Sequence, residues 1–594
     1  MQRRLAAAWL RDEEAHRRAN SEGRNYWDLY IAELCAQMGL SADVIGRDQL
    51  ATPGTLSRYS CLLLGALEDR PPSMPERQAL GDWLEQGGLL IGFNTRGLDG
   101  LFGIAPADLP PVPDNPFAQS ACVVLGEHRL CQGIRPALHP EQPLLAFGEL
   151  RPAKVVDAEV VARLVGLDRQ CDLGAAVTCR QAGRGWAVYF GFALPHTLWA
   201  LHQGRPVDRD WDGDGYFRTG DIFVIGDNEI EVPYADHLVW LVENVVALSR
   251  LPLIYALPPA NDRAATALFY WAGDDEFAAG DQVRASDFMR SLGLPYHINI
   301  MYKQGDFSLS PQEGEHIRAN GHDYSLHYNF VPSDGFPSAF EFSAADVSQQ
   351  ADAFYERFGV RAYATVNHWL RWTGYAEPAR WMSQVGGKGD GSFVHARMPP
   401  LDPCDIFGFP FGTSFPFRFY DDWRQGNELL QFVEKPLTGY EMGYSSEATE
   451  YTQLHRLLDL TQRQHLMTSL FYHSNRIANI PNCRAAICEV LRYIEEKGLV
   501  AKHLSLNGVV RWWLDRLASS VGNVREGEGG LSLDVVCEHA DGLVLRLPVE
   551  GGEGAHVRCD GKQCLHEVWQ ERGRSWLMVV VPQGEHRVEV IGAS

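Results

Sequence analysis

Strand-length apolar segments alternate with helix-length amphipathic segments through the middle of this chain. One helix is expected to begin after Ser310, because Pro311 occupies the first helical position and Glu313 completes a capping box. Another is expected over 344–358, ending at Gly359. This alternation predicts parallel strands joined by crossover helices, as in a barrel or a doubly wound sheet. The expected strands are 267–271, 296–302, 322–328 and 362–366.

The flanking regions follow different patterns. With 594 residues the chain exceeds what one hydrophobic core usually organises. Residues 61–64 and 89–93 are apolar and enclose a helix predicted over 76–86, the rhythm of an open, flavodoxin-like parallel sheet. Beyond residue 521 short alternating strands such as 543–549 predict a small all-β sandwich. We therefore predict an α/β protein with domains 1–255 (open sheet), 256–520 (distorted (β/α) barrel) and 521–594 (β-sandwich).

The first domain resembles the class I glutamine amidotransferases in its succession of strand, helix, WLEQGG and LLIGF. In that family a nucleophilic cysteine follows the strand, whereas this chain continues with Asn94-Thr95-Arg96. An amide cannot replace the thiolate nucleophile. We therefore expect a catalytically silent domain that serves in docking or assembly, and any homo-oligomer is expected to form through it.

Charge and apolar patterning exclude several classes of partner. The formal net charge of −23 disfavours phosphate backbones and anionic lipid surfaces, so neither nucleic acid nor membrane is an expected partner. No apolar stretch approaches the roughly 18 residues that span a bilayer. The twelve cysteines form no CxxC pair, and the N-terminus has no signal-peptide core. These features predict a cytoplasmic location.

Acidic and imidazole side chains collect where the predicted strands of the middle region end. An Asp-Asp-Glu sequence follows the first strand, and histidines follow or end three later strands. Because α/β domains assemble their sites at the carboxyl ends of strands, these side chains are expected to converge. They are Asp274, Asp275, Glu276, His327, His368 and His473.

Three short motifs in this region resemble those of the polysaccharide deacetylases (carbohydrate esterase family 4, NodB-like). They are YWAGDD at 270–275, GHDYSLH at 321–327 and FYH at 471–473, in the family's order. The resemblance implies Asp274 as the catalytic base and His473 as the catalytic acid. It also implies Asp275 and His327 as metal ligands.

The chain departs from the family pattern at the second metal histidine, where it has Val331. We expect His368 to replace that ligand, which gives a site of Asp275, His327 and His368. Two imidazoles and a carboxylate suit Zn²⁺, which lowers the pKa of a bound water to about 7. The predicted reaction is removal of an acetyl group from an N- or O-acetylated carbohydrate. Trp369, Arg371 and Trp372, in the loop after His368, are the expected substrate-binding residues.

Two other functions are compatible with the same residues. The middle domain could be a degenerate deacetylase barrel that only binds carbohydrate or serves in assembly. It could also be a glycoside hydrolase with paired carboxylates such as Asp275 and Glu341. The acidic segment 208–216 echoes a calcium loop, but the twelfth position counted from Asp210 is Asp221 instead of glutamate.

Overall fold

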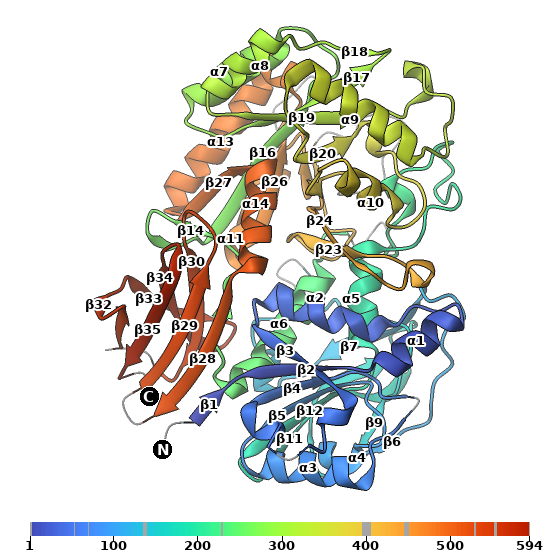
Figure 1. Ribbon diagram of the computed structural model, residues 1–594, viewed down its shortest axis with the longest axis vertical. Coiled ribbons are helices and arrows are strands. Elements are labelled where there is room, and N and C mark those ends of the chain that lie inside the picture. The colour runs from blue at the N-terminus through green and yellow to red at the C-terminus, as the bar shows by residue number, and fades with distance from the viewer. Residues whose placement is uncertain are drawn as a thin grey trace. The chain divides into compact units, whose positions relative to one another are not determined.

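The computed structural model describes residues 3–52, 54–68, 70–134, 139–226, 230–394, 405–444, 451–527, 530–551 and 555–592. The chain forms two compact units (Figure 1). Unit 1 comprises residues 1–202, 234–264 and 515–594, and unit 2 comprises residues 203–233 and 265–514. The mixed α/β class predicted from the sequence is confirmed, because both units contain large sheets and helices. Within the described residues, none of the helices combines the length and apolar character needed to cross a bilayer.

The core of unit 1 is an eleven-stranded sheet in which five neighbouring strands run parallel. These strands are β3 (Ala42–Gly46), β2 (Ala7–Arg11), β4 (Cys61–Leu64), β5 (Leu89–Phe93) and β12 (Gly185–Phe190). The sheet continues through antiparallel strands β11 (Asp172–Ala182), β10 (Glu159–Val165), β7 (Gln119–Leu125) and β8 (Leu144–Phe147), with β6 (Ile104–Pro106) and β9 (Ala153–Val155) off this path. Its helices are α1 (Glu13–Ser21), α2 (Ile31–Met38), α3 (Met74–Glu85), α4 (Asp99–Phe102), α5 (Leu194–Gln203) and α6 (Tyr234–Val246). Every residue of β4 and β5 is buried, which explains their continuous apolar sequence.

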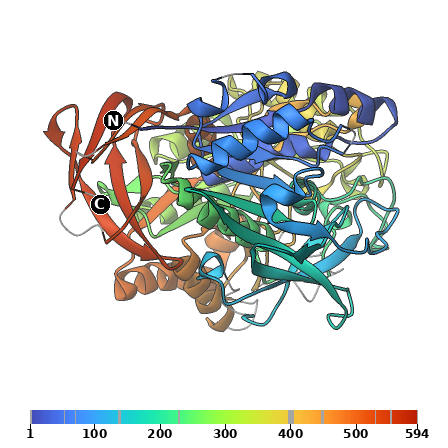
Figure 2. The same ribbon diagram turned by 90° about the horizontal axis from the view of Figure 1, so that it is seen from below.

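The C-terminal strands form two further antiparallel sheets in unit 1, and each recruits a short strand from elsewhere in the chain. The first is β1 (Arg3–Leu5), β28 (Ser520–Gly527), β29 (Gly530–Cys537), β35 (Gly584–Ile591), β31 (His556–Cys559) and β32 (Lys562–Gln563). The second is β13 (Leu253–Ile254), β30 (Leu543–Val549), β34 (Arg574–Val581) and β33 (His566–Glu571). Figure 2 shows both chain ends at these sheets. Unit 1 is therefore built from segments that lie before and after most of unit 2 in the sequence.

Unit 2 is organised around β16 (Ala267–Asp274), whose eight residues are all buried. Parallel pairing continues on one side through β17 (His297–Lys303), β19 (Asp323–Tyr328), β20 (Ala364–Asn367), β21 (Gly389–Asp390) and β24 (Leu429–Glu434). The other partners of β16 are β26 (Met467–Phe471) and β27 (Ala501–Ser505), also parallel. The remaining strands are β25 (Gly439–Tyr440), β22 (Ile406–Phe407), β23 (Phe417–Tyr420) and β18 (Asp306–Phe307). Between the strands that the structure describes, the pairing is an open path from β22 to β23.

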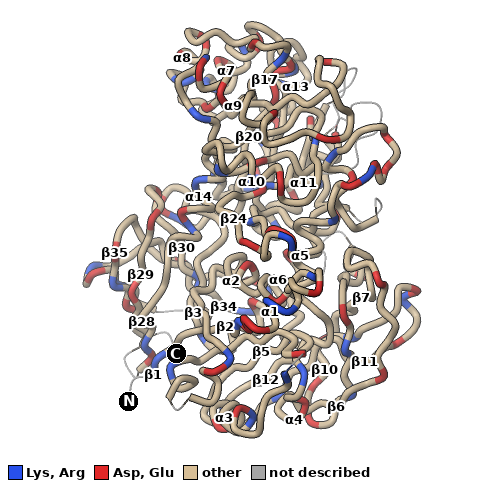
Figure 3. The backbone as a smooth tube through the Cα atoms, turned by 45° about the vertical axis from the view of Figure 1, so that its right-hand side comes forward, with Lys and Arg blue, Asp and Glu red and all other residues tan. Residues whose placement is uncertain are grey.

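The helices of unit 2 lie between these strands, as the alternation predicts. They are α7 (Asp281–Ser291), α8 (Pro311–Ala319), α9 (Ala344–Phe358), α10 (Glu377–Gln384), α11 (Thr452–Gln464), α12 (Ser474–Asn479), α13 (Pro481–Lys497) and α14 (Leu506–Ala518), the last of which continues into unit 1. The capping box at Ser310 is confirmed, since the Ser310 hydroxyl accepts from the Glu313 amide at 3.3 Å. Helix α9 ends at Gly359, which has φ +69°. Acidic and basic residues are interspersed along both units (Figure 3).

A glycine in β16 allows the end of β26 to approach closely. A Cβ at Gly273 would overlap the Tyr472 carbonyl oxygen, which also accepts a hydrogen bond from the Tyr296 hydroxyl at 2.6 Å. The two residues that follow these points of approach are Asp274 and His473. The approach therefore sets the spacing between two of the side chains predicted to be catalytic.

We predict that Gly273→Ala lowers the free energy of unfolding by about 1–3 kcal/mol, the usual cost of overpacking a core. Thermal unfolding measures the effect. The control is Gly522→Ala, where an added Cβ meets nothing within 4 Å. Unchanged stability of Gly273→Ala would show that the two strands can separate without cost.

Candidate active site

A pocket of about 640 Å³ opens at the carboxyl ends of β16, β20 and β26, entirely within unit 2. Side chains from the strand ends form one part of its lining, and the segment 213–218 forms another. The residues used below are Asp214, Tyr216, Arg218, Asp274, Glu276, His368, Trp369, Tyr440 and His473. The predicted convergence of acidic and imidazole side chains is thus present, although its membership differs from the prediction.

Asp274 is the last residue of β16 and faces this pocket. Its Oδ1 accepts from Asn299 Nδ2 at 2.9 Å, while its Oδ2 lies 3.4 Å from His327 Nε2 and 3.8 Å from His473 Nε2. Burial raises the pKa of Asp274 to about 8, and the charge of His473 only partly opposes this. The group therefore retains a proton near neutral pH, which suits a general acid.

Glu276 returns to the same pocket two residues later. Glu276 and Phe277 both have positive φ, +49° and +56°, a conformation that non-glycine residues rarely adopt. The turn brings Glu276 Oε1 to 3.3 Å from His473 Nε2. Burial acts to raise the pKa of Glu276, but the hydrogen bond and charge of His473 lower it well below its usual range. Glu276 is therefore a carboxylate beside a protonated acid.

His473 is held between two carboxylates. Its Nδ1 lies 2.5 Å from Glu441 Oε1, and its backbone N–H donates to the same oxygen at 3.0 Å. Burial acts to lower the pKa of His473, yet the hydrogen bonds with Glu276 and Glu441 raise it well above its usual value. Glu441, fully buried, was not singled out from the sequence, because it lies on the turn after β25 with no neighbouring motif.

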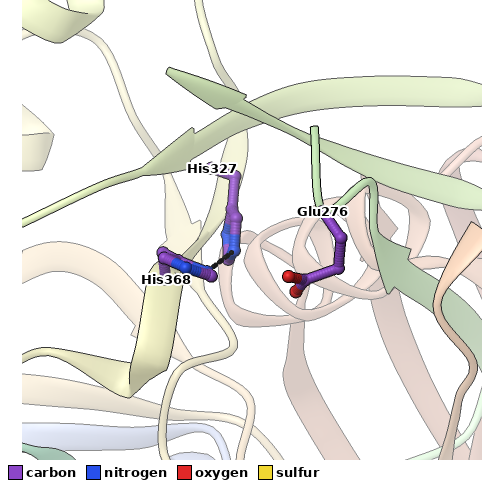
Figure 4. Close-up of side chains that lie close together, drawn as sticks. All are labelled: Glu276, His327 and His368. Carbon is purple, nitrogen blue, oxygen red and sulfur yellow. Dashed lines mark hydrogen bonds between the residues drawn. The ribbon is translucent and has the colours of Figure 1, made fainter. Parts of the chain in front are cut away.

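His327 and His368 lie beside this group with their ring nitrogens facing each other. His327 Nε2 is 3.1 Å from His368 Nδ1, and Figure 4 shows Glu276 opposite the pair. His327 Nδ1 contacts the Val366 carbonyl at 2.7 Å, and His368 Nε2 lies 3.5 Å from Asp334 Oδ2. Burial and the charge of His368 lower the pKa of His327 to about 3. His327 is thus neutral, the form of imidazole that binds metals.

The structure does not bring Asp275 into this cluster. Because successive residues along a strand point to opposite sides, Asp275 turns away from the pocket that Asp274 faces. Its Oδ1 accepts from the Met301 and Phe277 amides at 3.0 and 3.1 Å. Its Oδ2 accepts from Gln282 Nε2 at 3.0 Å and Ser308 Oγ at 2.8 Å. This fully buried carboxylate is saturated by donors and supports the turn after β16.

One group of side chains at this pocket that could together hold a cation is Glu276, His327 and His368. Each offers a ligand atom, and the three atoms lie within 4.8 Å of one another. Asp274, Glu276 and His473 form a second such group. The sequence indicated Glu276 only as the third residue of the acidic run, and nothing in the spacing distinguished it from Asp275.

The predicted substrate-binding residues have different environments. Trp369 lines the pocket and is 39% exposed, with φ +52°. Arg371 is buried and donates to the backbone carbonyls of Phe217, Phe330 and Phe340. Trp372 is buried and donates through Nε1 to the Tyr375 carbonyl at 3.0 Å. Neither Arg371 nor Trp372 lines the pocket.

Val331, at the position of the family's second metal histidine, and Glu341, the alternative carboxylate, also lie away from the pocket lining. Val331 is fully buried, and Glu341 is exposed. The carboxylate pair Asp275 and Glu341 therefore does not face this pocket.

In the acidic segment 208–216, Asp210 and Asp212 come within 4.8 Å of Asp221 through their carboxylate oxygens. The Asp210 carboxylate accepts from the amides of Gly213, Asp214 and Gly215, so its own loop engages it. The same segment brings Asp214, Tyr216 and Arg218 to the pocket.

Comparisons with known proteins give little guidance. No family model matches the chain, and no curated protein does. Among solved structures, a β-galactosidase from Rahnella sp. R3 is 16% identical over 32% of this chain and 28% of its own length, with a TM-score of 0.25. A β-galactosidase from Halorubrum lacusprofundi is 18% identical over the same shares, also with a TM-score of 0.25. The chain thus spans less than a third of the length of these galactosidases.

A ThuA-like protein from Bacteroides uniformis is 16% identical over 42% of this chain and 91% of its own, with a TM-score of 0.24. TM-scores this low carry no statement about the fold or the activity of this chain.

The predicted membership of the polysaccharide deacetylases is wrong. No family model matches the chain, that of the deacetylases included. The geometry supplies a physical reason, because the aspartate that the family motif assigns to the metal turns away from the histidines. The predicted activity as a metal-dependent carbohydrate deacetylase is wrong with it. The amidotransferase-like assignment of residues 1–255 finds no matching family model.

We predict that Asp275→Asn lowers the free energy of unfolding by about 1–3 kcal/mol, because an amide N–H₂ would face groups that are themselves donors. Asp274→Asn is the matched control. The native Asp274 carboxyl is already neutral near pH 7 because burial raises its pKa to about 8, so its change should be small. Urea unfolding of both variants beside the wild type measures this, and equal losses would contradict the assignment of Asp275 as a structural residue.

Proposed function

We propose that this pocket hydrolyses a glycosidic bond of a carbohydrate, with Asp274 as the proton donor and Glu276 as the carboxylate opposite it. The observation that carries the proposal is the placement of the two carboxyl groups. Oxygens of Asp274 and Glu276 lie within 4.8 Å of each other and of a ring nitrogen of His473, at one pocket. Retaining glycosidases place their two carboxyl groups about 5–5.5 Å apart.

The two environments suit different roles in this reaction. Asp274, protonated because burial raises its pKa to about 8, would deliver its proton to the departing glycosidic oxygen. Glu276, kept ionised by His473, would attack the anomeric carbon or stabilise the positive charge that develops there. Asp274, then deprotonated, would accept a proton from the water that releases the sugar. A pair of carboxyl groups with pKa values moved apart by their surroundings is the general solution for such acid and nucleophile pairs.

His473 acts as a positioning residue in this proposal. Glu441 holds the imidazole from behind, and the ring faces Glu276 at 3.3 Å. Its positive charge keeps Glu276 ionised and limits the freedom of that side chain. The interaction therefore maintains the separation between the two carboxyl groups.

The pocket lining suits a sugar. Trp369, Tyr440 and Tyr216 offer aromatic faces, while Arg218 and Asp214 offer a donor and acceptors for hydroxyl groups. Tyr216 and Trp369 pack edge to face with ring centroids 5.3 Å apart. Arg218 lies over the Trp369 ring at 5.2 Å. Binding through several hydroxyl contacts would orient the scissile bond toward Asp274.

A second candidate function, divalent cation binding, is favoured by a separate observation. Glu276, His327 and His368 form a carboxylate and two-imidazole set, and the Val366 carbonyl orients His327. This donor set suits Zn²⁺, and a carbonyl partner on the second ring nitrogen is typical of metal-binding histidines. A bound Zn²⁺ would supply Lewis acidity and an activated water. Glu276 would then be a ligand instead of the nucleophile.

We predict that Asp274→Asn and Glu276→Gln each lower kcat by at least about a hundredfold, the usual contribution of a proton-transfer group. A panel of nitrophenyl glycosides, with nitrophenol release followed, provides the assay. Asp287→Asn is the control, because Asp287 is an exposed carboxylate of unit 2 paired with His316. Hydrolysis of a panel member by the wild type and by both variants at equal rates would refute the assigned roles.

Zinc binding distinguishes the two candidates. If the cation site exists, the wild type dialysed against Zn²⁺ should retain one equivalent by elemental analysis, and His327→Ala and His368→Ala should retain less. Asp287→Asn should retain the wild-type amount, because Asp287 is an exposed carboxylate outside the cluster. A wild type without zinc, whose activity is unchanged by a chelator, would eliminate the cation and leave the carboxylate mechanism.

A further inference from the structure

Unit 1 contains a separate cavity of about 120 Å³ at the carboxyl ends of β2, β4 and β5. Parallel sheets in α/β folds characteristically bind ligands at this edge. The residues that line it include four carboxylates, one from each of four chain segments. They are Asp12, Asp28, Glu68 and Glu149.

The position of Asp28 depends on a glycine. Its Oδ2 accepts from the Ala66 amide at 2.9 Å, and a Cβ at Gly65 would overlap this carboxylate. The absence of a side chain at position 65 thus lets a carboxylate from outside the sheet reach the end of β4. The acidic wall, which we define as Asp12, Asp28, Glu68 and Glu149, therefore depends on the close approach of Asp28 to the backbone at Gly65. It is more than an accumulation of charge at the surface.

Asn94 adds an acceptor without a partner at the end of β5. The residue is 1% exposed and adopts a left-handed backbone conformation with φ +54°. Its Nδ2 donates to Glu149 Oε2 at 2.9 Å. Its Oδ1 is buried and has no hydrogen-bond partner, although the residue lines the cavity. Buried carbonyl oxygens are seldom left in this state, so a ligand donor is indicated.

The cations near the cavity are paired with carboxylates. Arg24 forms an ion pair with Glu22, and Arg96 pairs with Glu149 and with Glu68, the latter at 3.3 Å. His196 also lines the cavity and donates from Nε2 to the Pro116 carbonyl at 2.9 Å. Burial lowers the pKa of His196 to about 4, so it adds no positive charge. The wall therefore keeps an excess of acceptors and negative charge.

Aromatic rings complete the lining. Trp27 stacks on His196 with ring centroids 3.9 Å apart and an interplanar angle of 3°. Tyr26 is next to it in the lining. An aromatic face attracts a cation and also packs against apolar groups. The rings and the carboxylates therefore both favour a ligand with a positive charge.

We propose that this cavity binds a small organic cation that carries a protonated amine and hydroxyl groups, as an amino sugar does. The ammonium group would contact Glu68, Asp28 and the Asn94 carbonyl oxygen. Hydroxyl donors would reach the remaining carboxylate oxygens, and Trp27 would cover the carbon skeleton. The inference is independent of the function proposed for the pocket of unit 2.

Calorimetric titration of the full chain with glucosamine, glucose and N-acetylglucosamine tests this proposal. Glucosamine should bind at least tenfold more tightly than the two neutral sugars, because only it carries the positive charge. Equal affinities for the three, or no binding of glucosamine, would overturn the proposal.

Variants locate the binding at this cavity. Asn94→Gly removes the unpartnered oxygen and tolerates the left-handed backbone, and Glu68→Gln changes a half-exposed carboxylate with little risk to folding. Each should weaken glucosamine binding at least fivefold. Asp82→Asn, an exposed change on α3, should leave it unchanged. Wild-type affinity in both cavity variants would place the binding elsewhere and refute the assignment.

Discussion

The left-handed turn directly after β16 is the constraint on which the candidate active site depends. Glu276 and Phe277 both adopt positive φ, a conformation that costs an L-residue about 1–2 kcal/mol. The four hydrogen bonds that the Asp275 carboxylate accepts stabilise this turn. Asp275 therefore contributes to the site through the backbone, and the strain places Asp274 and Glu276 on the same side of the sheet.

The burial of charge at this place has consequences for chemistry. Asp274, His473 and Glu441 are buried, so each depends on its neighbours for its protonation state. The pairing of His473 with two carboxylates stabilises a positive charge, which in turn keeps Glu276 ionised. Asp274 has no cation as close and retains its proton. An acid and a carboxylate thus arise from residues two positions apart.

The sequence predicted the secondary structure of unit 2 well where local signals are strong. The capping box at Ser310 and the stop at Gly359 are set by short-range geometry, and both are present. The convergence of His327, His368 and His473 with the acidic run could also be predicted, because parallel strands end at one edge. The choice between Asp275 and Glu276 could not, since it depends on a backbone turn that the periodicity of a strand does not reveal. The similarity of three motifs to a known family led to the wrong assignment for the same reason.

Contacts between residues distant in the sequence determine the features that local patterns do not predict. Apolar runs and their alternation with helices were enough to indicate parallel sheets, because burial and hydrogen bonding of the backbone leave few other solutions. Nothing local showed that β1 would pair with β28, that β13 would pair with β30, or that residues 203–233 would belong to the second unit. Glu441 behind His473, and Asp28 beside Gly65, are likewise brought into place by chain packing. Residue types and local propensities therefore specify the elements, whereas the chemistry of both cavities arises only when separate segments fold against each other.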